Sequence, residues 1–302
     1  MKKVALPCRL YTITLSFESG RRISRFPAAT LRGGLGYVLR GVVCSTPDLP
    51  CLHCLLKHRC AYSFLFATPP PPGAARLQSY EAIPRPFALR PRLESDELEL
   101  LLIGTALPYL PYLIYALNVL GKKGVGTSRL RFAIQTVRCA DTHIYPVGDN
   151  EVLPDAGFDT LTVEPGEPCN GAVRLQLLTP LVLRRENRVL MDIDPRVLVA
   201  SLLRRLTNLD AFFGSGAQGL DPAPYLQSAD TLTVHEQQLR VACNRRTSTR
   251  QNREIDYSGL TGSVVLKGEV GTLLPLLRTG EVLGVGKNTV FGFGLYRMEK
   301  IA

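Results

Sequence analysis

The stretch GVGKNTVFGFG, Gly284–Gly294, holds four glycines among apolar residues and one Lys-Asn pair, a few residues before the chain stops. Glycine weakens a strand or a helix, so such a cluster indicates positive φ angles or the close approach of a backbone or a ligand. An ordinary tight turn before a last strand would also use glycines. Because these glycines precede a strand instead of opening a helix, a dinucleotide-binding loop is disfavoured.

Outward from this stretch, apolar periodicity predicts two similar halves. The second half is predicted as strand, helix, strand, strand, helix and strand, at 173–183, 195–213, 231–242, 259–270, 272–280 and 288–299. The first half has a strand, a helix, a strand, a helix and a strand, with its second strand obscured, at 9–19, 27–43, 97–107, 107–121 and 129–137. The order βαββαβ is that of the ferredoxin-like unit. The expected fold class is α+β, with two tandem ferredoxin-like (RRM-like) domains.

The domain boundaries follow from the same pattern. The segment GKKGVGTSRLRF, 121–132, places a second glycine loop after the last helix of the first half, which indicates duplication. We expect a first domain at 1–148, a linker at 149–172 and a second domain at 173–302. A cysteine-rich insertion at about 44–95 interrupts the first domain. Its proline-rich part, 67–77, is predicted to be a surface loop.

Composition points to a basic globular protein. The net charge is +10, and 28 of the 36 basic residues are arginine. Arginine grips phosphate with two hydrogen bonds and stacks on bases, which favours a nucleic-acid partner, although a background rich in arginine would give the same bias. No apolar run reaches the roughly 18 residues of a membrane span, and Pro7 and Arg9 interrupt any apolar signal core. We therefore expect a cytoplasmic chain with no membrane partner.

Four stretches carry a family resemblance: LRGGLGYVLR (31–40), CAYSFLF (60–66), RRTSTRQ (245–251) and PLLRTGEVLGVGKNTVFGFGLYR (275–297). Together they resemble the CRISPR precursor-RNA-processing endoribonucleases of the RAMP superfamily. The resemblance covers nearly the whole chain, and the glycine stretch is its most specific part. It implies CRISPR repeat RNA or crRNA as the partner, with other CRISPR effector subunits as further candidates. It also implies RNA cleavage without a catalytic cofactor.

The resemblance places two segments against RNA. Bare backbone lets phosphates approach amide groups, while a lysine can neutralise phosphate and an asparagine can contact a base or a sugar. In the glycine stretch the expected RNA-binding residues are Gly284, Gly286, Lys287, Asn288, Gly292 and Gly294. In the basic segment 244–253, expected as a loop, they are Arg245, Arg246, Ser248, Arg250 and Gln251. Weaker candidates are Arg32, Arg40, Arg184 and Arg185. A merely solvated loop is the alternative for 244–253.

Four of the eight cysteines crowd into one segment. Their spacing is C-x6-C-x2-C-x5-C, at Cys44, Cys51, Cys54 and Cys60. The inner C-x2-C pair is typical of zinc sites, and a cytosolic chain keeps its thiols reduced. We therefore expect a structural zinc ion, with an iron–sulfur cluster or four buried cysteines as alternatives.

The resemblance also implies a mechanism in which the RNA 2′-hydroxyl attacks the adjacent phosphate and leaves a 2′,3′-cyclic phosphate. Relatives that use a Tyr, His and Lys set imply Tyr37, His53 and Lys57 here, with His58 as the rival base. Both histidines lie among the cysteines, so a ligand or structural role stays open. Arg246 or Arg250 could instead stabilise the charge of a site without histidine. A non-catalytic crRNA-binding subunit and a zinc-dependent interaction module are the alternative functions.

Overall fold

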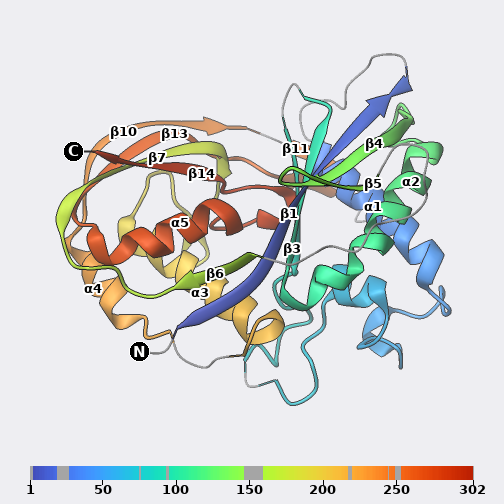
Figure 1. The fold of residues 1–302 in the computed structure, drawn as a ribbon, viewed down its shortest axis with the longest axis horizontal. Helices are drawn as coiled ribbons and strands as arrows, with labels where there is room; N and C mark the ends of the chain where they lie inside the picture. Colours follow the sequence, from blue (N-terminus) through green and yellow to red (C-terminus); the bar gives the residue numbers. More distant parts are fainter. Residues whose placement is uncertain are drawn as a thin grey trace. The chain divides into compact units, whose positions relative to one another are not determined.

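The structure is a computed structural model that describes residues 3–18, 27–74, 76–92, 95–145, 159–216, 220–243, 245–248 and 253–301. In β11 (Arg245–Ser248) and β12 (Arg253–Asp256) it describes the backbone alone. The chain divides into two compact units (Figure 1). The N-terminal unit is Leu6–Thr160, and the C-terminal unit is Leu161–Ala302 together with Met1–Ala5.

The N-terminal unit is an antiparallel sheet with two main helices. The sheet order is β2-β3-β1-β4-β5, and β6 also pairs with β1. The bounds are β1 Val4–Phe17, β2 Phe87–Pro91, β3 Glu97–Ile103, β4 Phe132–Cys139, β5 Thr142–Tyr145, β6 Asp159–Val163, α1 Pro27–Val43 and α2 Leu110–Lys123. The chain order β1-α1-β2-β3-α2-β4, with β1 and β3 in the middle, is the ferredoxin-like arrangement.

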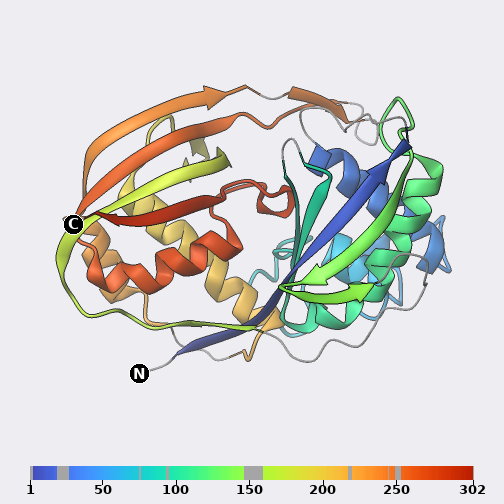
Figure 2. The ribbon, with the colours of Figure 1, turned by 45° about the horizontal axis from the view of Figure 1, so that its top comes forward.

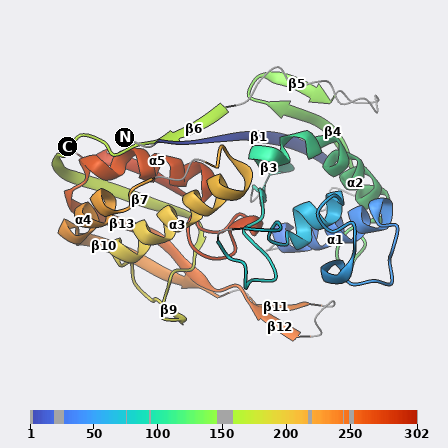
Figure 3. The same ribbon diagram turned by 90° about the horizontal axis from the view of Figure 1, so that it is seen from below.

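The core of this unit forms where α1 and α2 cover one face of the sheet (Figure 3). Alternation along β1 turns Tyr11, Ile13 and Leu15 into the core, where each is buried. A side chain at Gly34 of α1 would meet Leu120 of α2 at 2.8 Å, so glycine permits the close contact of the two helices.

The strand that was obscured in the sequence is β2. The apolar run Phe87, Ala88 and Leu89 is fully buried, so it shows no alternation. Prolines stand at 84, 86 and 91, and proline argues against a central strand because it cannot donate to the ladder. An edge strand tolerates proline, and β2 lies at the edge of its sheet.

The C-terminal unit repeats the arrangement, with the sheet order β10-β13-β7-β14. Its helices gather on one face of the sheet (Figure 2). The bounds are β7 Asn170–Leu181, α3 Pro195–Phe213, α4 Ala223–Thr231, β10 Thr233–Ala242, β13 Gly259–Glu269, α5 Leu274–Leu283 and β14 Tyr296–Ile301. The fold class expected from the sequence, two tandem ferredoxin-like folds, is confirmed.

The start of α3 is also as predicted. The side chain of Asp194 accepts a hydrogen bond from the amide of Val197 at 2.9 Å, and Pro195 occupies the first turn. The helix α4, which precedes β10, was not expected from the sequence.

Two small hairpins belong to the C-terminal unit (Figure 3). One joins β8 (Arg184–Arg185) and β9 (Arg188–Val189). The other pairs β11 with β12 and continues the β10–β13 hairpin outward. The prediction that 244–253 is a loop is therefore wrong for 245–248, which form a strand. The sequence hid this strand, because Arg245–Ser248 has no apolar residues at alternate positions to mark a strand.

Other boundaries differ where glycine or asparagine takes a positive φ. The closing strand, expected at 288–299, begins only at Tyr296, because φ is 64° at Asn288 and 75° at Gly292.

Of the expected linker, 149–158 lies outside the described residues, and the rest includes β6 and the start of β7. The division at 148 and 173 stays a proposal. Among the described helices, none combines the length and apolarity needed to cross a bilayer.

The two units end their second helices in the same way. Gly124 closes α2 with φ 83° and ψ 151°, and Gly284 closes α5 with φ 71° and ψ 163°. Each amide donates a 2.8 Å hydrogen bond back into its helix, to Leu120 and to Gly280 respectively. Positive φ makes glycine the favoured residue at both caps.

Glu269, at the end of β13, ties three segments of the C-terminal unit together. Its carboxylate accepts hydrogen bonds from the amides of Thr272 at 3.0 Å and Cys169 at 3.2 Å. Its backbone carbonyl accepts one from Ser228 of α4 at 2.6 Å. Burial alone would raise the pKa of Glu269, but these hydrogen bonds favour the charged form and hold the pKa below its ordinary value.

We expect the stabilisation by Glu269 to depend on pH. A lowered pKa in the folded state means that the contribution is complete above the ordinary glutamate pKa and is lost as the pH falls through the folded pKa. At pH 7, Glu269→Gln should therefore lower the free energy of unfolding by about 1 kcal/mol, and the difference should shrink below about pH 4. Denaturant unfolding at several pH values, with the exposed Glu299→Gln as the control, measures this. A difference that does not change with pH would contradict it.

Candidate functional site

The glycine loop, Gly284–Gly294, joins α5 to β14 and is fastened to the end of β7. The amide of Lys287 donates to the carbonyl of Val182, and the amide of Gly294 donates to that of Pro180, both at 3.0 Å. The amide of Val285 donates to the carbonyl of Gly294, also at 3.0 Å, which closes the loop on itself. The loop is therefore a fixed part of the C-terminal unit.

Both packing and backbone conformation require glycine at two positions of the loop. At Gly294, φ is 69° and an added Cβ would lie 1.8 Å from the carbonyl oxygen of Val285. At Gly286, φ is 82° and an added Cβ would lie 2.4 Å from the carbonyl oxygen of Val182. Neither separation is possible for a real side chain, so the loop can close only where these positions carry no side chain.

Exposure separates the residues that shape the loop from those that a ligand can reach. Gly284, Gly292 and Gly294 are buried, whereas Gly286 is half-buried and Lys287 is exposed. The part of the loop that solvent reaches is thus centred on the lysine.

The turn after Lys287 offers amide groups. Asn288 is left-handed and is followed by a helical turn, Thr289–Phe291. In the part of the chain that the structure describes, the amides of Asn288, Thr289 and Val290 have no hydrogen-bond acceptor. A left-handed residue followed by a helical turn aims successive amides at one point, an arrangement that suits an anion such as phosphate.

The basic segment lies on a hairpin of the same unit. Arg245, Arg246 and Ser248 are in β11, opposite Asp256, Ile255 and Arg253 of β12. Arg250 and Gln251 lie outside the described residues.

Arg32 is placed differently from the other basic candidates. It belongs to α1, is half-buried, and its guanidinium lies 5.0 Å from the ring centre of Phe66 and 5.9 Å from that of Phe87. Cation–π packing of this kind stabilises the N-terminal unit. The geometry favours a structural role for Arg32 over contact with RNA.

The four catalytic candidates lie in the N-terminal unit. Tyr37 is on α1 with 77% of its side chain exposed, and both His53 and His58 are exposed. The ammonium of Lys57 donates to the carbonyl of Leu52 at 3.0 Å. Among the described residues, no hydrogen bond joins any of the four side chains to another. The structure does not bring them into a preformed catalytic set.

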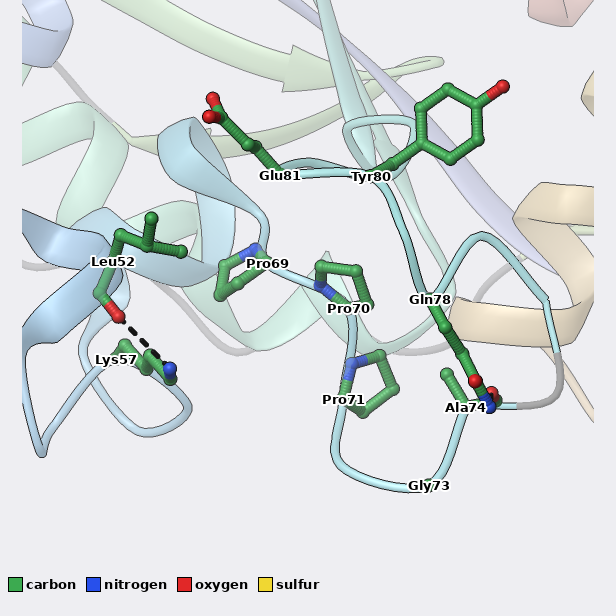
Figure 4. Close-up of a pocket in the computed structure, with 10 residues that line it drawn as sticks. All are labelled: Leu52, Lys57, Pro69, Pro70, Pro71, Gly73, Ala74, Gln78, Tyr80 and Glu81. Atoms are coloured by element: carbon green, nitrogen blue, oxygen red, sulfur yellow. Dashed lines mark hydrogen bonds between the residues drawn. The ribbon is translucent and has the colours of Figure 1, made fainter.

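Lys57 also lines a pocket of about 440 Å³ (Figure 4). Pro69, Pro70 and Pro71 form one wall, opposite Leu52 and Lys57, whereas the ring of Tyr80 points away from them. This pocket was not expected from the sequence, since its walls come from two irregular segments. The proline run in the sequence was its only signal.

The four clustered cysteines are electrostatic neighbours. Burial raises the pKa of Cys51, the charge of Arg40 lowers it, and Cys60, Cys44 and Cys54 each raise it. Within the described residues, however, no three or more His, Cys, Asp or Glu side chains are arranged to hold a metal ion. The geometry does not fit the expected zinc site, so structural zinc rests on the spacing alone and stays a proposal.

Two ferredoxin-like units, the second closed by a glycine loop before its last strand, define a RAMP-type protein. Comparison with known families gives two matches. Residues 175–296 match the model of the CRISPR-associated endoribonuclease Cas6, and residues 6–157 match a model named AF_1859_N, which describes an N-terminal domain. The match over the C-terminal unit supports a CRISPR Cas6/RAMP-type protein, and the matching model describes endoribonucleases.

The chain is also similar to individual proteins. An uncharacterised protein of Archaeoglobus fulgidus is 27% identical over 89% of this chain and 90% of its own. The fold is similar to that of Thermus thermophilus Cas6, with a TM-score of 0.54, 18% identity, and 98% of this chain and 99% of that chain covered. A Cas6 complex with a substrate mimic gives a TM-score of 0.51 at 20% identity, covering 98% of this chain and 100% of the other.

We expect Gly294→Ala to destabilise the protein by about 2 kcal/mol or more, since an alanine would be strained at positive φ and would collide with backbone. The control is Gly33→Ala in α1, where an added Cβ meets nothing within 4 Å. That change should stabilise the protein by about 0.5–1 kcal/mol, as is usual for glycine inside a helix. Denaturant unfolding compares the two variants, and equal effects would contradict this role of the loop glycine.

If the cysteines hold an ion, the purified protein should contain about one zinc or iron per chain, because four thiolates complete one tetrahedral site. Changing Cys51 and Cys54 together to Ser should release the ion and lower the melting temperature. Elemental analysis checks this, with Cys169→Ser and Cys243→Ser, two exposed cysteines outside the segment, as the control pair. Protein prepared without chelator that contains neither metal would mean four free thiols.

Proposed function

We propose that this chain cleaves CRISPR repeat RNA within precursor transcripts and so releases guide crRNAs, through attack by the RNA's own 2′-hydroxyl and without a catalytic metal. The observation that carries the proposal is the family match over 175–296, which includes the glycine loop and the β11–β12 hairpin. The similarity to a Cas6 in complex with a substrate mimic supports RNA as the partner.

The chemistry needs three aids. The 2′-oxygen forms a bond to the adjacent phosphorus, and the bond from phosphorus to the 5′-oxygen of the next nucleotide breaks. A base accepts the proton of the 2′-hydroxyl, an acid returns a proton to the leaving oxygen, and a cation stabilises the charge that builds on the phosphate. The products carry a 2′,3′-cyclic phosphate and a 5′-hydroxyl.

We propose His53 or His58 as the base, with Tyr37 and Lys57 in the same site. The exposure of Tyr37 and both histidines leaves them accessible to an RNA chain. Catalytic hydrogen bonds commonly tighten only when substrate is bound, so the lack of contacts among the four residues is compatible with this role. Arg246 or Arg250 would carry the charge stabilisation if the site works without histidine, chiefly by holding the RNA in line.

For RNA binding we propose the exposed Lys287 and the amides after it, together with the arginines of the 245–251 segment. In this role the buried glycines set the shape of the loop, while Lys287 meets the phosphate. A backbone grip of this kind depends on charge, so binding should weaken as salt is added.

A second function is a non-catalytic crRNA-binding subunit within a larger CRISPR assembly. It is favoured by one observation, that no histidine among the described residues is hydrogen-bonded to a partner that would orient it. Both functions use the same binding surfaces, and they differ only in whether bound RNA is cut.

The decisive measurement replaces one ribose by deoxyribose just upstream of the cut. Because the nucleophile belongs to the RNA, this change should abolish cleavage while binding is largely kept. A metal hydrolase would use metal-bound water and would still cut. Cleavage by the unmodified protein should also persist in EDTA and should yield a cyclic phosphate.

The same assay identifies the base. His53→Ala or His58→Ala should lower the cleavage rate by about 100-fold or more if that residue is the base. His143→Ala in β5 and His235→Ala in β10 are the controls, since both lie outside the cysteine segment. If the double variant of His53 and His58 cuts RNA normally, neither histidine is the base, and the arginines become the candidates for catalysis. If the unmodified protein binds RNA but never cuts it, the non-catalytic crRNA-binding function is favoured.

A further inference from the structure

The β8–β9 hairpin has an unusual sequence for its size. Its six residues, Arg184–Val189, read RRENRV, so half of them are arginine. The two turn residues, Glu186 and Asn187, have φ of 49° and 64°, as a two-residue hairpin turn of the primed type requires. Asparagine tolerates this conformation, whereas glutamate adopts it rarely.

The hairpin adds nothing to the hydrophobic core. All six of its residues are exposed, including Val189, in contrast to β7 before it, where Val173, Leu175 and Leu181 are buried. A two-stranded hairpin without a buried face is marginal on its own. Packing therefore does not account for its presence.

Polar contacts hold the hairpin in place instead. The amide of Leu190 donates to the carbonyl of Leu183 at 3.0 Å and closes its base. Arg185 forms an ion pair with Asp194, the residue that caps α3. The hairpin is thus anchored to the first turn of a well-packed helix.

Charge on the hairpin is not balanced within the described part of the chain. Arg185 and Arg188 are directly opposite each other, and like charges at such a pair are unfavourable. Asp194 neutralises Arg185, but no carboxylate of the described residues lies at ion-pair distance from Arg184 or Arg188. Two exposed guanidinium groups are left, and each has the planar fork that matches a phosphate.

The hairpin begins at the point where the glycine loop is fastened. Val182, two residues before Arg184, accepts the hydrogen bond from the amide of Lys287 and packs against Gly286. Leu181, Val182 and Leu183 are all buried, so this junction is fixed. The exposed Lys287 and the arginine hairpin are therefore presented by one continuous, rigid piece of the C-terminal unit.

We propose that the β8–β9 hairpin is a third RNA-binding element, in which Arg184 and Arg188 grip backbone phosphates of the RNA that also meets the glycine loop. The proposal rests on the proposed function, since it needs RNA to be the ligand. In Figure 3 the hairpin projects from the C-terminal unit, and all six of its residues are exposed.

The test is the salt dependence of repeat-RNA binding, measured by fluorescence anisotropy with the full chain. The double variant Arg184→Ala/Arg188→Ala should lower the slope of log affinity against log salt by about 1.4, because each phosphate contact contributes about 0.7 with single-stranded RNA. At physiological salt this corresponds to about tenfold weaker binding. Arg188→Glu alone should weaken binding at least as much, since it adds repulsion.

The matched control is Arg204→Ala/Arg278→Ala, which removes the same charge from exposed positions on α3 and α5. It should leave the slope unchanged. Melting temperatures close to that of the unmodified protein confirm that both double variants fold, and Asp194 and Arg185 are left intact for this reason.

Three results would overturn the proposal. If Arg184→Ala/Arg188→Ala leaves the slope unchanged while the unmodified protein binds normally, the hairpin does not bind RNA and the proposed function is unaffected. If the same variant also loses binding to another CRISPR subunit, the hairpin is a protein-binding surface instead. Equal losses in hairpin and control variants mean a general charge effect. If the unmodified protein does not bind repeat RNA at all, the proposed function fails and the hairpin proposal with it.

Discussion

The hydrogen bonds between the end of β7 and the glycine loop are the constraint on which the C-terminal unit depends. The amides of Lys287 and Gly294 reach the carbonyls of Val182 and Pro180, and this contact sets where β14 enters the sheet beside β7. It demands backbone without side chains at Gly286 and Gly294. The same contact exposes Lys287 and fixes the base of the arginine hairpin, so the fold and the proposed binding surface depend on the same hydrogen bonds.

Much of the topology can be read from the sequence. Alternation and helical periodicity suffice for the central strands and main helices, because these elements have one buried and one exposed face. They fail for β2, whose residues are buried on both faces and flanked by proline, and for β11, where the sequence shows no apolar face. Strands at the edge or beyond the core are held by register with a neighbour, which a single segment does not reveal.

The candidate site is less predictable for a different reason. Spacing identified the glycine loop, but not that three of its four glycines are buried and only shape it. The sequence offered Tyr37, His53, His58 and Lys57 by residue type, whereas catalysis depends on distances that residue type does not fix. Residue type was also misleading for Arg32. It was a candidate for RNA binding because it is basic, but its guanidinium packs on Phe66 and Phe87. The pairing of β8 with β9 could not be predicted from the sequence, because it depends on the positive φ angles of Glu186 and Asn187.

The matching caps of α2 and α5 have a consequence for how such a protein can arise. Gly124 and Gly284 end their helices in nearly the same conformation, yet the first leads into a short turn bridged between Val125 and Leu130, and the second into the long glycine loop. After duplication of an ancestral unit, lengthening the connection beyond one cap would leave the hydrophobic cores of both copies untouched. The half that carries the glycine loop could then diverge freely while the other half kept the short connection.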